Sequence, residues 1–296
     1  MINKSLHTIG ESELIITDRG NIYHLDLAPQ HLAHTVIFVG DQGRVKEVSK
    51  RFDEVTHTAH HREFITHTGR IGKKPISVVS TGIGPDNTDI VFDELDALLN
   101  IDFQTRTIKD EKKSLSVFRL GTCGALQNDI AVDSLIISSH AIGLDNLMHY
   151  YKMDNTPDER YILEEFRHHT RLDMSHILPY ISESSISLRK HFGPSYHHGI
   201  TVTCPGFYGP QGRSLRLAPA FPNLLDAMAT FNCQNNRIVN FEMETAAIYS
   251  LGKMLGHKCI SINCVVANRA NKTFSRDHKR AVEDMIESSL ELIAGL

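Results

Sequence analysis

The sequence predicts an α/β protein in which a central mixed β-sheet is covered on both faces by helices, giving three layers. Short apolar runs alternate with segments of helical periodicity along most of the chain, which is the pattern of strands connected by helices. Hydrophobic residues make up 41% and charged residues 22% of the 296 residues, so the chain can bury a large core. Because no low-complexity linker or internal repeat interrupts this pattern, we expect one domain over residues 1–296.

The expected strands are short apolar runs, many of them bounded by glycine or by charged residues. The run TVIFVG at residues 35–40 is typical of a buried strand, and the next two runs are separated by a Gly/Lys turn that predicts a hairpin. In chain order, the expected strands cover residues 35–40, 62–71, 74–80, 114–120, 134–144, 199–204 and 258–268.

The expected helices have apolar residues at helical spacing. In residues 86–99, Asp86 and Asn87 are candidates for the N-cap. The charged residues 109–114 predict a solvated loop, and the polar residues 151–192 predict a surface elaboration with some helical pattern. The expected helices cover residues 42–52, 86–99, 243–256 and 277–296.

Composition argues against several classes of protein. A formal net charge of −4 and a pI near 6.5 are unusual for a nucleic-acid binder, which is typically basic. No apolar run approaches the roughly 18 residues of a membrane span, and the N-terminus lacks the apolar core of a signal peptide. The 5 cysteines are widely spaced and odd in number, which predicts free thiols in a reducing compartment. We therefore expect a cytoplasmic protein that binds neither nucleic acid nor membranes.

Four of the 18 histidines form a sequence cluster, at His57, His60, His61 and His67. Their spacing matches no standard zinc motif, and no paired cysteines lie nearby. We expect strand and surface histidines here and no metal site.

Two glycine-containing segments after strands are candidates for an anion site, because ligands bind at the carboxyl ends of strands in such sheets. Gly40 lets the backbone approach a ligand, and Arg44 near a helix start suits an anion. In RLGTCGA we expect Arg119 to enter a turn with Thr122 in its middle. The arginine either forms a buried salt bridge or holds phosphate together with the hydroxyl and backbone amides. Cys123 has no base near it in sequence and is expected to be a packed thiol.

The loop GFYGPQGR at residues 206–213 combines an aromatic pair with Gln211 and Arg213. A plain surface turn has no use for an aromatic pair. A site for a flat polar ring needs aromatic faces, an amide with donor and acceptor, and a guanidinium group. The loop therefore predicts a site for such a ring.

Two carboxylates, Glu242 and Glu244, lie at the start of an expected helix. Either the helix dipole favours them there, or they bind vicinal hydroxyls of a sugar while Met243 packs on its ring. The last strand ends at Asn268 and Arg269, which places a charge where a ligand would lie.

Taken in order, these segments resemble the nucleoside phosphorylase family, in its uridine phosphorylase branch. The matching runs are YHLDL, GDQGRV, HREF, STGIG, RLGTCGA, FYGPQGR, NFEMET and VVANR, which span residues 23–269 in the family's order. The resemblance implies an α/β/α sandwich around a mixed sheet, assembled as dimers or trimers of dimers. It also implies reversible phosphorolysis of uridine to uracil and ribose 1-phosphate, with inorganic phosphate as co-substrate and no organic cofactor.

The resemblance assigns a role to each matching residue. Arg119, Gln211, Arg213 and Glu244 would carry the catalysis, and two residues, Arg62 and His24, would come from the neighbouring subunit. Phosphate would be held by Gly40, Arg44, Arg62, Arg119 and Thr122; ribose by His24, Met243 and Glu244; and the base by Gly124, Phe207, Gln211, Arg213 and Arg269.

The sequence also departs from the family pattern. Purine-directed and hydrolytic relatives place an aspartate after the last strand, where this chain has Asn268 and Arg269, which favours a pyrimidine. The aromatic pair is followed by Gly-Pro in place of Pro-Gly, and Gly212 replaces a charged residue. Glu63 matches one ligand of a potassium site found in some members, but Asn87 stands where serine is usual.

Two alternatives remain open on sequence grounds. The chain could be a phosphorylase for deoxyuridine, thymidine or a purine nucleoside, since an elaboration at residues 145–197 could reshape the mouth of the pocket. It could also be a nucleoside-binding protein without catalytic activity.

Overall fold

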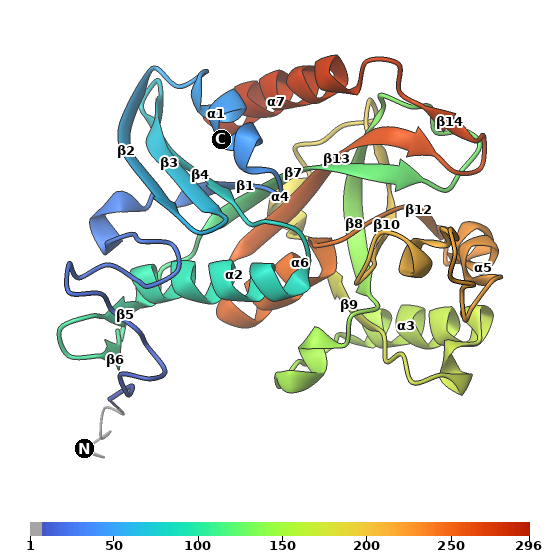
Figure 1. Cartoon of the computed structure of the whole chain (residues 1–296), viewed down its shortest axis with the longest axis horizontal. Helices are drawn as coiled ribbons and strands as arrows, with labels where there is room; N and C mark the ends of the chain where they lie inside the picture. The colour runs from blue at the N-terminus through green and yellow to red at the C-terminus, as the bar shows by residue number, and fades with distance from the viewer. Residues whose placement is uncertain (1–7) are drawn as a thin grey trace. The chain divides into compact units, whose positions relative to one another are not determined.

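The computed structural model describes residues 8–296, and their contacts divide the chain into two compact units (Figure 1). The first unit contains residues 8–82 and 89–116, and the second contains residues 83–88 and 117–296. Each unit has strands and helices of its own, while the single domain expected over residues 1–296 stays a prediction.

The first unit combines one parallel and three antiparallel strand pairs, one of which joins the short strands β5 and β6. Strand β1 pairs in parallel with β4, which pairs antiparallel with β3, and β3 pairs antiparallel with β2. Figure 1 shows β2, β3 and β4 side by side, and α1 packs against β3 and β4. The bounds are β1 Thr35–Val39, α1 Gln42–Ser49, β2 Glu54–His61, β3 Phe64–Ile71, β4 Lys74–Ser80, α2 Pro85–Asn100 (in this unit from residue 89), β5 Ile101–Asp102 and β6 Thr107–Ile108.

Strand β2 was not predicted, because none of its side chains is buried and its sequence has no apolar run. Backbone pairing with β3 alone makes it a strand, which side-chain patterns do not reveal. His57, His60 and His61 lie on β2, and His67 lies on β3. Residues 8–296 contain no group of three or more His, Cys, Asp or Glu side chains placed to hold a metal ion.

In the second unit, five strands close into a ring. Strands β12, β10, β8, β13 and β7 are neighbours in that order, and β12 also pairs with β7, with Asn240 opposite Ala125. β8, β10 and β12 run parallel, whereas β13 is antiparallel to β8. The bounds are β7 Ser116–Ala125, β8 Leu135–Gly143, β9 Tyr180–Glu183, β10 His197–Thr203, β11 Asn232–Cys233, β12 Asn236–Glu242, β13 Lys258–Asn268 and β14 Thr273–Phe274.

Helices pack against these strands. Helix α6 contacts β8, β9, β10 and β13, α7 contacts β13, and α5 contacts β12. In the part of the chain that the structure describes, no helix combines the length and apolar character needed to cross a membrane. The bounds are α3 Pro157–Thr170, α4 Ile186–Arg189, α5 Leu224–Thr230, α6 Thr245–Leu255 and α7 His278–Ala294.

The surface elaboration expected over residues 151–192 is in part a component of the core. Helix α3, which belongs to this segment, lies beside α5 (Figure 1). Its Ile162 and Phe166 are buried in a cluster with side chains of β8, β10 and β12. Glu159 fixes the helix, because its carboxylate accepts from the backbone nitrogen of Glu183 at 2.9 Å and from Lys253 Nζ at 2.6 Å. The polar sequence of this segment does not predict these contacts, because the partners lie far away along the chain.

Two other expectations were wrong. The turn expected within RLGTCGA does not exist, since β7 continues through Gly121 and Thr122 to Ala125. Helix α2 begins at Pro85, so Asp86 and Asn87 lie inside its first turn and are not its N-cap. The first error came from treating glycine as a turn residue, whereas glycine inside a strand often marks a close approach of another group. The second came from taking Asp and Asn as capping residues, although both lie after the first residue of the helix.

Candidate active site

The loop at residues 206–213 is tightly organised. Gly209–Gln211 form a single 3-10 turn, and the carbonyl of Tyr208 accepts from the backbone nitrogens of Gln211 at 3.1 Å and Arg213 at 2.8 Å. Gly212 has a φ of +67°, and a Cβ there would lie 3.2 Å from Leu225 Cβ, so this position requires glycine. The loop therefore fixes the directions of the side chains on either side of Gly212.

Gln211 is buried and held by two arginines. The Arg213 guanidinium donates from Nη1 to Gln211 Oε1 and, at 2.7 Å, to the carbonyl of Phe207. Arg269 Nη1 donates to the Gln211 carbonyl at 3.1 Å. Among the described residues, no group bonds to Gln211 Nε2, so this donor is available to a ligand.

The aromatic residues of the loop have different surroundings. The Arg213 guanidinium lies 3.8 Å from the centroid of the Phe207 ring, and Tyr208 meets that ring edge-on. Both Arg213 and Arg269 also face the buried ring of Phe241, at 5.7 and 5.8 Å. Burial and the neighbouring Arg269 charge lower the pKa of Arg213. Two cations and an amide donor thus converge at one place in the second unit.

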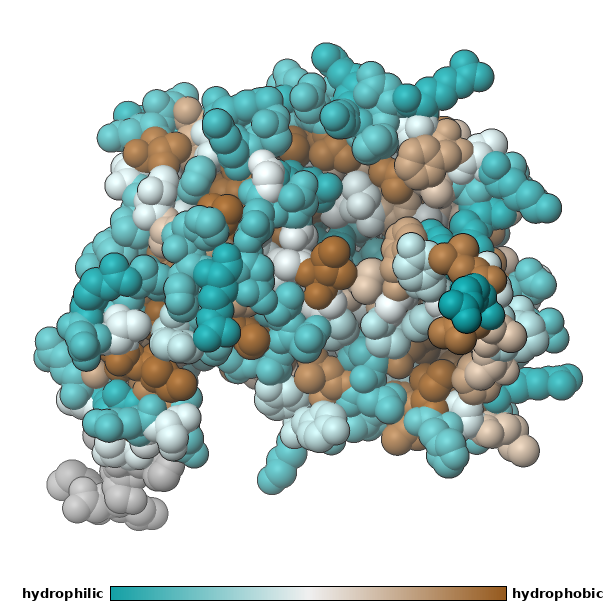
Figure 2. Space-filling model, viewed as in Figure 1, coloured by the Kyte–Doolittle hydropathy of each residue, from teal (hydrophilic) through white to brown (hydrophobic). Residues whose placement is uncertain are grey.

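An apolar cavity of about 740 Å³ adjoins this loop. Tyr208 and Arg213 line it together with Leu144, Ile177, residues 215–221 and Leu224. Leu215 and Leu217 on this segment are 80% and 86% exposed. Figure 2 shows brown and tan surface gathered in the region of α5, which this segment precedes.

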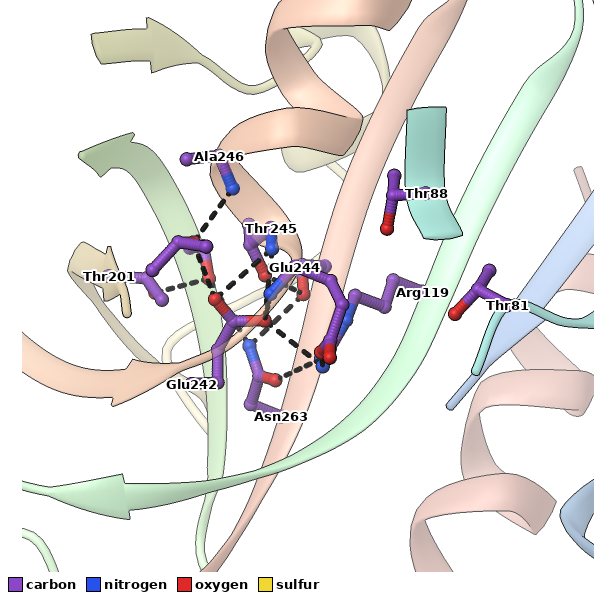
Figure 3. A network of polar contacts seen from close by, with 12 residues as sticks. Thr81, Thr88, Arg119, Thr201, Glu242, Glu244, Thr245, Ala246 and Asn263 are labelled. Atoms are coloured by element: carbon purple, nitrogen blue, oxygen red, sulfur yellow. Dashed lines mark hydrogen bonds and ion pairs between the residues drawn. The ribbon is translucent and has the colours of Figure 1, made fainter. Parts of the chain in front are cut away.

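The second feature of the site is a buried ion-pair cluster around Arg119 (Figure 3). Arg119 Nη2 pairs with Glu244 Oε2 and lies 3.0 Å from Glu242 Oε2, while Nη1 donates to Asn263 Oδ1 at 2.6 Å. Arg119, Glu242 and Glu244 are at most 5% exposed. Of the two interactions predicted for Arg119, the structure contains the buried salt bridge. The phosphate contact stays a prediction.

The two glutamates have different partners. Glu242 accepts from the backbone nitrogens of Glu244 at 2.9 Å and Thr245 at 3.0 Å, and from Thr203 Oγ1 at 2.6 Å, which places it as an acceptor at the start of α6. Glu244 accepts from the backbone nitrogen of Gly84 at 2.9 Å. Since protein donors occupy both oxygens of Glu242, Glu244 is the better candidate of the two for binding a sugar.

Burial shifts the ionisation of this cluster. Burial on its own lowers the pKa of Arg119, but the charges of Glu242 and Glu244 more than offset this, so its pKa is raised. Burial raises the pKa of Glu244, against the opposing effect of Arg119 and together with the charge of Glu242. Arg119 therefore keeps its charge, and burial favours the protonated form of Glu244.

Thr122, Cys123 and Gly124 follow Arg119 on β7 and have different surroundings. Thr122 is partly exposed and makes no hydrogen bond with Arg119 in the described structure. Cys123 is buried, and burial raises the pKa of its thiol, so it is a poor nucleophile, as expected. A Cβ at Gly124 would lie 3.0 Å from the Phe241 ring, so this glycine lets that ring pack under the two arginines.

Gly121 determines how Arg119 lies. A Cβ at Gly121 would come within 1.6 Å of Arg119 Nη1, so the guanidinium folds back over a strand position that only glycine can occupy. We expect Gly121→Ala to lower the free energy of unfolding by about 3–5 kcal/mol, the cost of breaking a buried ion pair. Urea denaturation measures this, with Gly209→Ala as control because nothing lies within 4 Å of a Cβ there. Equal unfolding midpoints for the two variants would contradict the assignment.

The remaining predicted residues belong to the first unit. Asp41 caps α1 by accepting from the backbone nitrogen of Gly43 at 2.9 Å, which places Arg44 in the first helical turn, as predicted. A Cβ at Gly40 would lie 3.3 Å from the carbonyl oxygen of Gly82. Glycine at position 40 therefore permits two backbone segments to lie close together.

His24 and Arg62 share one patch of the first unit. His24 Nδ1 bonds to Glu94 Oε1 at 2.7 Å, and the His24 carbonyl is 3.2 Å from His61 Nδ1. Arg62 Nη2 is 3.4 Å from the Tyr23 hydroxyl, and Tyr23 contacts both the His24 and His61 rings. The two residues expected to cross a subunit interface thus occur together.

Sequence reasoning missed two positions that organise the site. Glu94 orients His24 from α2, and Asn263 holds Arg119 from β13. The signal for Asn263 was present, because Ser261 and Asn263 alternate with Ile260, Ile262 and Cys264 in an otherwise apolar strand. Polar residues two apart lie on one face of a strand, and a buried polar face needs a partner.

Comparison with known proteins identifies the family. The model of the phosphorylase superfamily matches residues 34–295. A uridine phosphorylase of Thermococcus kodakarensis is 31% identical over 94% of this chain and 88% of its own length. The chain belongs to the phosphorylase superfamily.

Further relatives agree with this membership. The uridine phosphorylase of Escherichia coli is 26% identical over 93% of this chain and 99% of its own length. The crystal structure of a Trypanosoma brucei nucleoside phosphorylase, described as showing uridine phosphorylase activity, has a TM-score of 0.87 and 29% identity, covering 96% of this chain and 100% of its own. The predicted α/β/α fold with a central mixed sheet is thereby confirmed.

Proposed function

We propose that this protein catalyses the reversible phosphorolysis of uridine to uracil and ribose 1-phosphate. The observation that carries the proposal is the buried Gln211, held by Arg213 and Arg269 with its Nε2 donor unengaged. Uracil offers O2, N3–H and O4, so Gln211 can accept from N3–H while donating to an oxygen. The uridine phosphorylase activity named for the relatives supports the same substrate.

Cleavage of the glycosidic bond leaves negative charge on the departing uracil. Arg213, Arg269 and the Gln211 amide lie together where a planar base can meet them, with the Phe207 ring beside Arg213. Donors fixed where charge develops stabilise the transition state more than the ground state. Rate enhancement at the base therefore comes from preorganised donors, with no acid needed to protonate the ring.

Phosphate acts at the other face of the sugar. We assign it to Arg44, Arg62 and Arg119, together with Gly40 and Thr122, following the family pattern. An oxocarbenium-like sugar is stabilised by an approaching anion, and fixing that anion in line with the anomeric carbon supplies much of the remaining acceleration. Since phosphate attacks directly, no nucleophilic side chain of the enzyme is required.

The sugar lies between these two sets of groups in the proposal. Glu244 binds the 2′- and 3′-hydroxyls, Met243 packs against the ring, and His24 reaches the 5′-hydroxyl from the neighbouring subunit. Glu244 is the carboxylate of the cluster that is not tied to the start of α6. A carboxylate suits this task because it accepts from two hydroxyls at once.

The last residue of β13 and the residue that follows it favour a pyrimidine. Asn268 Nδ2 donates to the carbonyls of Gln127 at 2.8 Å and Ile130 at 2.6 Å, so its amide serves the fold. Arg269, next in sequence, reaches the Gln211 loop. This position supplies a cation for the oxygens of uracil and no carboxylic acid for a purine ring.

We further propose that the reaction uses inorganic phosphate as co-substrate and no organic cofactor, and that the protein is cytoplasmic. All 5 cysteines are free and buried, which suits a reducing compartment. Assays in potassium against sodium buffer test whether the Glu63 position contributes a cation site, since a monovalent ion would change the rate without being consumed.

The active form is proposed to be a dimer or a larger assembly that shares residues between subunits. Arg62 is exposed and lies beside Tyr23 and His24, so one patch can deliver both residues to a neighbouring copy. We expect fractions that are monomeric in size-exclusion chromatography to lack activity. A monomer that turns over uridine would contradict shared sites.

The decisive experiment follows uridine loss with and without inorganic phosphate while measuring ribose 1-phosphate. Loss that depends on phosphate and yields equal amounts of uracil and ribose 1-phosphate supports the proposal. A panel with deoxyuridine, thymidine and inosine separates the alternatives, because cleavage of inosine but not uridine would overturn the pyrimidine assignment. Tight uracil binding without turnover would instead indicate a nucleoside-binding protein.

A further inference from the structure

We propose that Asn263, with Glu242, is a positioning residue that holds the phosphate-binding arginine, Arg119, from inside the strand ring without touching substrate. The inference rests on the proposed function, because it concerns the arginine assigned to phosphate. It starts from the geometry of the guanidinium, whose Nη1 is held by Asn263 Oδ1 at 2.6 Å and whose Nη2 is held by Glu242 and Glu244.

Asn263 is braced by a buried polar network. Its Nδ2 donates to Ser261 Oγ at 3.1 Å and lies 3.3 Å from Ser138 Oγ, and Ser138 Oγ bonds to Thr201 Oγ1 at 2.5 Å. Thr201 Oγ1 donates to Asn240 Oδ1 at 2.7 Å. The network therefore links β13, β8, β10 and β12 before it reaches the arginine of β7.

All of these polar groups face the interior of the ring. Ser261 and Asn263, Asn240 and Glu242, and Thr201 and Thr203 are pairs two residues apart, so each pair lies on one face of its strand. Every one of these side chains is at most 4% exposed. Figure 3 shows Thr201, Glu242 and Asn263 on one side of Arg119, with dashed lines from Glu242 and Asn263 to its guanidinium group.

Such a network restricts the guanidinium. A buried arginine is costly unless its donors are met, and bonds on both Nη1 and Nη2 fix the plane of the group as well as its position. The Arg119 Nε has no bond to another described residue, and neither Nη atom has more than its stated protein partners. The remaining donors are thus presented in one fixed direction, which is what recognition of an oxyanion requires.

Asn263 gives the cleanest test, because its removal changes no charge. In Asn263→Ala we expect the dissociation constant for phosphate, measured by isothermal titration calorimetry, to rise roughly 10- to 100-fold, the range for losing a charged hydrogen bond. Uracil binding should stay unchanged, since Gln211 and Arg213 are held by their own loop. In steady-state kinetics of Asn263→Ala, the KM for phosphate should rise while the KM for uridine stays unchanged.

Glu242→Gln distinguishes position from charge. Removing a negative charge beside the anion would by itself tighten phosphate binding, whereas losing the fixed geometry weakens it. The proposal predicts weaker binding in this variant too. Unchanged or tighter phosphate binding in both folded variants would overturn it.

Asn100→Ala is the matched control, because Asn100 is buried and its side chain, among the described residues, bonds only to Asp96 and Lys113. It should lower stability without changing phosphate affinity. If Asn263→Ala does not fold, Ser138→Ala removes one brace of the amide and is expected to give a smaller shift in the same direction. If wild-type protein does not bind phosphate, the proposed function fails. If Arg119→Lys loses phosphate binding while the Asn263 and Glu242 variants keep it, only the positioning role fails.

Discussion

Replacing Arg119 with alanine is expected to lower kcat/KM for phosphate by on the order of 10²- to 10³-fold, the usual effect of removing one transition-state donor. Two effects add. The variant loses the buried cation, and it leaves Glu242 and Glu244, both buried, without their shared counter-charge. The two carboxylates would then repel each other and the approaching phosphate.

The same variant should lose stability, by about 3–5 kcal/mol, because a broken buried ion pair leaves uncompensated charge. Arg119→Lys separates the two effects, since it keeps the charge but loses the planar fork. Phosphate binding is measured by calorimetry on protein shown to be folded by circular dichroism. Arg237→Ala serves as control, because Arg237 forms a comparable two-bond pair with Asp129 at the surface. Unaltered phosphate affinity in a folded Arg119 variant would contradict the site.

Replacing Gln211 with alanine is expected to lower kcat/KM for uridine by on the order of 10²- to 10³-fold, while phosphate affinity stays the same. The substitution removes the amide that meets uracil and also the acceptor that holds Arg213. A base that leaves with less stabilised charge leaves more slowly.

Gln211→Glu isolates the donor, because glutamate keeps an acceptor for Arg213 but cannot donate to a base oxygen. The kcat/KM of Gln211→Glu for uridine should be nearly as low as that of Gln211→Ala. Initial rates at varied uridine and saturating phosphate measure kcat/KM for the two variants. The exposed Gln104 provides a control through Gln104→Ala. Near-normal uridine kinetics in both Gln211 variants would place base recognition elsewhere.

Much of the fold could be predicted from local pattern. Apolar runs gave the strands at residues 35–39, 64–71, 74–80, 135–143, 197–203 and 258–268 to within a few residues, because their side chains are buried and apolar. Strands β2 and β12 were not predicted. β2 is held by backbone pairing, and β12 contains polar residues whose partners lie on other strands.

In the candidate site, too, some features could be predicted from the local sequence and others depend on long-range contacts. The composition of the 206–213 loop indicated a base site, and the loop does bring Gln211 together with Arg213 and Arg269. The sequence left two readings open for Glu242 and Glu244, and only hydrogen-bond partners distinguish them. Gly121 was predicted to be a turn residue. The structure shows that glycine is required there because the Arg119 side chain folds back over this position, a tertiary contact that the local sequence does not reveal.

The sequence by itself determined the α/β class, the order of the main elements and the kinds of chemical group available to a ligand. These follow from hydrophobic patterns and residue types within short segments of the chain. The tertiary structure alone decided which of those groups meet. Strands β7, β8, β10, β12 and β13 close into a ring, so polar residues far apart in the chain surround Arg119. The reason is physical: a buried charge is tolerated only where several strands supply its partners, and pairing between strands depends on backbone bonds that no local pattern encodes.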